Sequence, residues 1–93
     1  SVSISGDGSR LAIGAPSTST VTVLARSGGS WVVERTWDGK LLGYAPADVF
    51  GASVSLDATG SRLAVGANAA GTVGGVHLFV RSGATWTTAA RIA

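Results

Sequence analysis

The feature that most constrains the fold of this chain is an internal repeat. The segment SRLAIGA at Ser9–Ala15 returns as SRLAVGA at Ser61–Ala67. When the sequence is aligned with itself from Ser1 and from Ser53, 10 of the first 15 positions are identical. Self-similarity with a period of roughly 50 residues predicts a fold made of successive equivalent units.

The similarity resumes at RSGGSW (Arg26–Trp31) and RSGATW (Arg81–Trp86). By this point the second copy is three residues longer, and the extra residues lie between Ala67 and Val76. Insertions cost least free energy in loops, so we expect a loop at this place.

The composition favours short β-strands and argues against several other classes. Of the 93 residues, 45% are hydrophobic and 13% are charged, which excludes disorder. Val, Ala, Leu and Ile dominate, and 14 Gly punctuate them, as is typical of strands joined by tight turns. The net charge of +2 comes from dispersed basic residues, whereas nucleic-acid binding needs a basic cluster. Because Cys is absent, neither a disulfide framework nor a thiolate metal site can form.

Each copy divides into four short strands joined by turns. In the first turn, SGDGS or DATGS, Gly8 and Gly60 can adopt positive φ. The uncharged stretch Leu63–Val80 has a polar, Gly-containing break, so it predicts two strands around a turn and no membrane span. Two antiparallel meanders are therefore expected. Their strands are Val2–Ser5, Arg10–Ala15, Thr20–Arg26 and Trp31–Trp37, then Ser53–Leu56, Arg62–Ala67, Gly75–Arg81 and Trp86–Ile92.

The second strand of each copy has one face of large side chains and one face of small ones. In the first copy, Leu11 and Ile13 alternate with Ala12 and Gly14. The large face of one meander can pack on the small face of the next. The second copy repeats the pattern, with Leu63 and Val65 on one face and Ala64 and Gly66 on the other.

Stacked four-stranded meanders of this period are the blades of β-propellers. We therefore predict an all-β fold with two four-stranded antiparallel propeller blades, part of a larger or oligomer-completed β-propeller. Residues 1–38 form the first blade, 39–52 a linker, and 53–93 the second blade. Two stacked blades leave two outer apolar faces, so we expect further blades, from the same polypeptide or from identical chains, to cover them.

A more specific pattern surrounds the linker. ADVFGASVSL (Ala47–Leu56) followed by SRLAVGA resembles the FG-GAP repeat, the blade of integrin α-subunit propellers and of many bacterial surface proteins. IGAP at Ile13–Pro16, VGAN at Val65–Asn68 and the ending VHLFVRSGATW are similar to the same family. The resemblance implies an extracellular or cell-surface protein that serves structure, adhesion or protein interaction. It assigns structural motif positions to Gly14, Ala15, Pro16, Asp48, Phe50, Gly51, Gly66 and Ala67.

Integrin-type blades often carry a calcium loop, and this chain departs from that pattern. Calcium takes six or more oxygen ligands. Each equivalent loop offers one carboxylate, Asp7 or Asp57, and places Arg10 or Arg62 where a further acid would lie. We predict no metal site and no cofactor.

Catalytic patterns are also missing. The single His, His77, aligns with Thr22 in a strand, and GASVS (Gly51–Ser55) lacks the second Gly of a nucleophile elbow. GTVGG (Gly71–Gly75) has neither the spacing nor the Lys of a phosphate loop. We therefore expect a protein that is not an enzyme.

The tryptophans leave two interpretations open. Trp31 and Trp86 occupy equivalent positions, and Trp37 aligns with Ile92. Their rings could stack on a glycan or anchor a protein contact. Because they recur with the repeat, packing within the blades is the favoured interpretation. ERTWDGK (Glu34–Lys40) resembles a segment of small two-blade lectins that oligomerise into a complete propeller, which is the alternative function.

Overall fold

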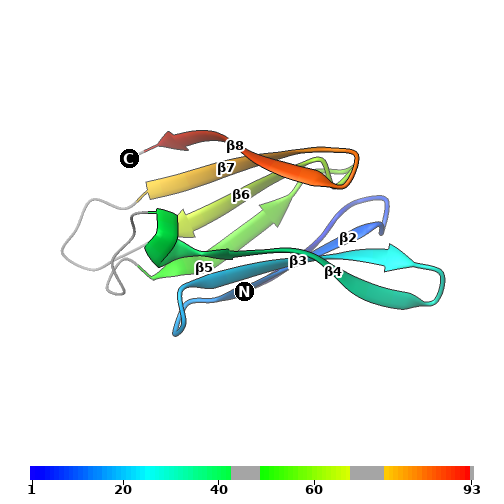
Figure 1. Ribbon diagram of the computed structural model, residues 1–93, viewed down its shortest axis with the longest axis horizontal. Helices are drawn as coiled ribbons and strands as arrows, with labels where there is room; N and C mark the ends of the chain where they lie inside the picture. Colours follow the sequence, from blue (N-terminus) through cyan, green and yellow to red (C-terminus); the bar gives the residue numbers. More distant parts are fainter. Residues whose placement is uncertain (43–48, 68–74, 93) are drawn as a thin grey trace.

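The chain forms two four-stranded antiparallel β-sheets that pack face to face (Figure 1). The computed structural model describes residues 1–42, 49–67 and 75–92. In each sheet every strand pairs with its neighbours along the chain, and a 3-10 helix, η1 (Gly39–Leu42), follows the first sheet. The strands are β1 (Val2–Ile4), β2 (Arg10–Ala15), β3 (Thr20–Ser27) and β4 (Ser30–Asp38), then β5 (Phe50–Leu56), β6 (Arg62–Ala67), β7 (Gly75–Ser82) and β8 (Thr85–Ile92).

The expected all-β class and the two antiparallel meanders are confirmed. The clearest difference lies in β5, which begins at Phe50, three residues before the expected Ser53. Phe50 pairs with Ala67, and the register shifts between Phe50 and Ser53. Gly51 lies in this irregularity with a φ of 93°, which glycine adopts without steric cost. The FG pair therefore belongs to the first strand of the second sheet.

The two sheets present opposite kinds of face to each other. In β2, Ala12 is fully buried, whereas the adjacent Ile13 is 41% exposed. In β6, Leu63, Val65 and Ala67 are buried, whereas Ala64 and Gly66 between them are half-buried. The large-residue face of the second sheet thus packs on the small-residue face of the first, as the alternation predicted. The buried cluster consists of Ala12, Val21, Val23, Trp37, Phe50, Leu63, Val65, Ala67, Phe79 and Trp86.

Both sheets have a β-bulge at the equivalent place in their last strand pair. The residue left without a pairing partner is Glu34 in β4 and Ala89 in β8, and these two positions align in the repeat. A bulge re-aims the side chain of the extra residue. The repeat therefore keeps the irregularity but changes the side chain that it presents.

Candidate functional site

The most specific polar contacts lie around Glu34, where the two sheets meet. The bulge in β4 directs the Glu34 carboxylate toward Arg10 of β2 and Trp86 of β8. Arg10 donates from Nε to Oε1 at 2.8 Å and from Nη2 to Oε2 at 3.1 Å. The indole Nε1–H of Trp86 donates to Oε1 at 2.8 Å. One carboxylate therefore links the first sheet to the second.

These polar groups are largely withdrawn from water, since the side chains of Arg10 and Glu34 are only 14% and 8% exposed. Desolvating two charges costs free energy, and bidentate geometry offsets much of that cost. We interpret the pair chiefly as fixing the placement of one sheet on the other, because such pairs add little net stability.

An aromatic cluster lies beside this carboxylate. Trp37 of the first sheet stacks on Phe79 of the second, with ring centroids 4.0 Å apart. Trp37 also meets Trp86 edge-on at 5.7 Å. Aromatic pairs in these geometries stabilise beyond the area that they bury. Trp37 and Trp86 thus form the centre of the contact between the sheets.

The three tryptophans proposed from sequence as ligand-binding residues therefore differ in position. Trp37 and Trp86 are buried between the sheets, which favours the packing interpretation for both. Trp31, by contrast, is 39% exposed at the start of β4. It is the tryptophan that a partner could reach.

Several residues for which the sequence predicted structural motif positions also lie at the contact between the sheets. A Cβ added to Gly14 would meet the carbonyl oxygen of Gly51 and the hydroxyl of Ser1. Phe50 and Ala67 are buried in the core, and a Cβ at Gly39 would meet the Phe50 ring. Ala15 and Pro16 are half-buried at the end of β2, Gly66 lies in β6, and Asp48 lies outside the described residues.

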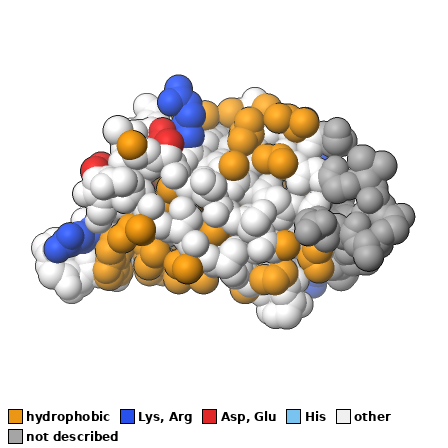
Figure 2. Space-filling model, turned by 180° about the vertical axis from the view of Figure 1, so that it is seen from behind, with side chains coloured by type: hydrophobic (Ala, Val, Ile, Leu, Met, Phe, Trp, Pro, Cys, Tyr) orange, Lys and Arg blue, Asp and Glu red, His pale blue; other side chains and the backbone are white. Residues whose placement is uncertain are grey.

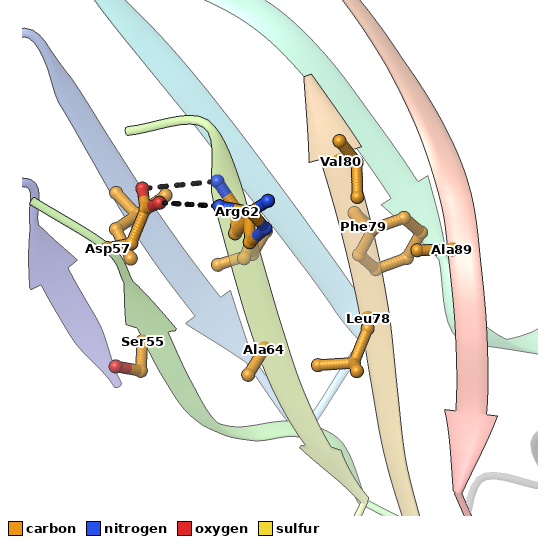
Figure 3. A pocket seen from close by; sticks show the side chains of 10 residues that line it. Ser55, Asp57, Arg62, Ala64, Leu78, Phe79, Val80 and Ala89 are labelled. Atoms are coloured by element: carbon orange, nitrogen blue, oxygen red, sulfur yellow. Dashed lines mark hydrogen bonds and ion pairs between the residues drawn. The ribbon is translucent and has the colours of Figure 1, made fainter. Parts of the chain in front are cut away.

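The outer face of the second sheet is hollowed by a pocket of about 320 Å³ (Figure 3). Leu78 and Val80 of β7 and Ala64 of β6 contribute to its lining. Asp57 and Arg62 lie together on one side of the pocket, with Oδ2 of Asp57 3.8 Å from Nη1 of Arg62. The sequence predicted an uncovered face on this sheet, but it did not indicate that the face would be hollowed by a pocket.

The carboxylates of Asp7 and Asp57 accept hydrogen bonds from residues of their own loops. Asp7 Oδ1 accepts from the hydroxyls of Ser5 and Ser9, each at 2.7 Å, and these bonds lower the pKa of Asp7 to about 2. Desolvation raises the pKa of Asp57, but backbone N–H groups of Arg62 and Ser61 and the Arg62 charge outweigh it and leave this pKa low. Among the described residues, no three potential ligands of the His, Cys, Asp and Glu types gather.

We expect calcium to leave the stability of the chain unchanged. Serine donors already occupy Oδ1 of Asp7, and the guanidinium of Arg62 lies 3.8 Å from Oδ2 of Asp57. Each loop offers one carboxylate, whereas calcium takes six or more oxygen ligands and favours several carboxylates among them. Thermal unfolding with millimolar calcium and with a chelator should give the same midpoint. A rise in midpoint with calcium would contradict this prediction.

His77 is buried in β7 against aromatic rings. Its ring stacks on Phe79 at 4.6 Å and meets Phe50 edge-on at 6.5 Å, and its Nε2 lies 3.3 Å from the Thr88 hydroxyl oxygen. Desolvation, assisted by the charge of Arg91, lowers the pKa of His77 below its usual value of 6.5. The folded chain therefore favours neutral imidazole.

We expect the chain to lose stability as the pH falls from neutral through the usual pKa of His77. In that range the unfolded chain binds a proton that the folded chain resists, and this shifts the equilibrium toward unfolding. Asp7 contributes in a separate range, because its stabilisation is lost only as the pH falls from 3.8 toward about 2. Urea unfolding at neutral and mildly acidic pH measures the effect, and His77→Gln should reduce the difference. Equal pH dependence in the variant would exclude His77 as the cause.

No protein-family model, no curated protein and no solved structure matches this chain. Within the described part of the chain, no helix is long and apolar enough to cross a membrane.

Proposed function

We propose that this chain is a non-catalytic, FG-GAP-like β-propeller segment of an extracellular or cell-surface protein, and that it serves structure, adhesion or protein interaction. The observation that carries the proposal is the way the two repeats stack. The large face of one repeat covers the small face of the other, and one face of each kind is left over. This is the arrangement expected of adjacent units in a longer series.

Three ionisable groups of the described residues, Glu34, Asp7 and His77, support a role in binding and structure over catalysis. Glu34 is held by Arg10 and Trp86, and Asp7 by two serines. His77 is buried among aromatic rings. A general acid or base must reach a substrate, and these groups are engaged in packing and turns.

A second candidate is a small lectin that completes its propeller by oligomerisation. The exposed Trp31 favours it, because an accessible aromatic ring can stack on a sugar. Binding of the wild-type chain to immobilised glycans, lost in Trp31→Ala, would support the lectin. Equal signals from both chains would exclude Trp31 as a sugar platform.

The proposal is tested on the native polypeptide that carries this sequence. Its intact mass would show whether the chain is long enough to hold further repeats, and electron microscopy of single particles would show its shape. We expect ring-shaped particles built from sheets stacked around an axis. Particles without a ring would contradict the proposed function.

A further inference from the structure

We infer that the outer face of the second sheet is a docking site for the first sheet of a second copy of this chain, and that Trp31 is the side chain that enters it. The inference rests on the proposed function and deepens it, because it names the partner and the contacts. Its evidence is that the chain already contains one such interface, between its own two sheets.

In the alignment of the two repeats, the docking site on the second sheet is equivalent to the surface of the first sheet that contacts Trp86. On that surface, Arg10 and Glu34 form the polar contact, and Ala12 and Val23 belong to the same buried cluster as Trp86. On the second sheet, the equivalent strands β6, β7 and β8 contribute to the pocket. Its residues Arg62, Ala64, Leu78 and Ala89 align with Arg10, Ala12, Val23 and Glu34.

The outer face of the first sheet carries the matching side chains, and nothing described covers them. Trp31 aligns with Trp86, and Ile13 aligns with Val65. In the second sheet these positions are 3% and 0% exposed, whereas in the first they are 39% and 41% exposed. Figure 2 shows hydrophobic side chains along the lower edge of the molecule, where the first sheet lies. An exposed apolar face of this kind marks an interface.

The glycines supply independent support. Added Cβ atoms at Gly14 and at Gly66 would meet the hydroxyls of Ser1 and Ser53, which are equivalent contacts within each sheet. Only Gly14 also meets backbone of the other sheet, at Gly51, whose carbonyl accepts a hydrogen bond from Ser1 Oγ at 2.8 Å. The second sheet therefore keeps a flat face suited to close approach, and no neighbour covers it among the described residues.

One position distinguishes the two interfaces. Ala89 replaces Glu34, so the pocket lacks the carboxylate that accepts the Trp86 indole N–H. The carboxylate available on the lining is Asp57, which lies beside Arg62 (Figure 3). We therefore expect docking between copies to be weaker than the contact within the chain, and to depend on protein concentration.

The docking site and Trp31 lie on opposite outer faces, so the interface is heterologous and each copy uses one face of each kind. Two complementary variants test this directly. Trp31→Ala removes the inserting side chain and keeps the pocket, whereas Ala64→Arg blocks the pocket and keeps Trp31. Sedimentation velocity should show wild-type association that rises with concentration, and each variant alone should remain monomeric. An equimolar mixture of the two should form a dimer and nothing larger.

Val32→Ala is the matched control, because Val32 is 53% exposed next to Trp31 but lies on the other face of β4. It should associate as the wild type does, and circular dichroism should confirm that all variants are folded. Acrylamide quenching of wild-type tryptophan fluorescence gives a second readout, since docking should shield Trp31 as concentration rises.

A wild-type chain that stays monomeric, or a variant mixture that forms no dimer, would overturn the inference. Neither result would alter the particle shape of the native polypeptide, which tests the proposed function separately.

Discussion

A chain with valine in place of Gly14 should lose about 3 kcal/mol of unfolding free energy, the upper end of the usual range for overpacked sites. Its melting temperature should fall by more than about 10 °C, given the size of the domain. The reason is geometric, because the first added carbon already meets the backbone of Gly51 in the facing sheet. Backbone cannot rotate away as a side chain can, so Gly14→Ala should be damaging as well. Thermal and urea unfolding measure both variants.

Gly66 is the matched control for this substitution. The repeat places both glycines on a small-residue face that a neighbouring blade can approach, which predicts that Gly14→Val and Gly66→Val are both severely destabilising. In the structure, a Cβ at Gly66 closely approaches only the Ser53 hydroxyl, the end of a rotatable side chain. Gly66→Ala should therefore change the stability of the monomer by less than about 1 kcal/mol. Equal losses at Gly14 and Gly66 would contradict the observed packing of the sheets.

Replacing Glu34 with alanine should cost about 3 kcal/mol, the lower end of the range for breaking a buried ion pair. The substitution leaves the largely buried guanidinium of Arg10 without its carboxylate and removes the acceptor of the Trp86 indole. Glu34→Gln should be less damaging, because an amide oxygen can still accept one of these hydrogen bonds. Urea unfolding of both variants measures the loss.

The repeat provides a control for the ion pair too. Arg62 is equivalent to Arg10, but its side chain is 75% exposed and lies 3.8 Å from Asp57. Exposed pairs contribute little to stability, so Arg62→Ala should hardly move the unfolding midpoint. A double-mutant cycle of Glu34→Ala with Trp86→Phe isolates the contact between the sheets. A coupling energy near zero would show that this hydrogen bond does not join them.

The two four-stranded antiparallel sheets could be predicted because the repeat shows each strand and turn twice. Alternation of large and small residues in β2 and β6 predicted which faces would meet, and Gly8 and Gly60 marked the turns, with φ of 73° and 70°. The start of β5 was harder to predict, since Phe50 joins the sheet only through the irregularity at Gly51.

The contact around Glu34 could not be predicted in this way. Arg10 and Trp86 recur as Arg62 and Trp31, but Glu34 aligns with Ala89. A prediction based on the residues that the two copies share therefore does not single out Glu34. The bulge that aims Glu34 is one extra residue in β4, and no motif in the sequence marks its position. In the sequence, β4 carries Arg35 directly after Glu34 and ends at Asp38, so nothing local distinguishes Glu34 from the other charged residues of this strand.

The two outer faces of the molecule differ, since one exposes Trp31 and the other carries the pocket. A stack of copies therefore has two different ends. Adding a copy at either end regenerates the same two ends, so growth does not exhaust the binding surface. It stops only if the rotation per step brings the last sheet onto the first, and otherwise it continues as a fibre. A chain carrying Ala64→Arg would then act as a terminator, shortening assemblies of the wild type even when it is the minor component.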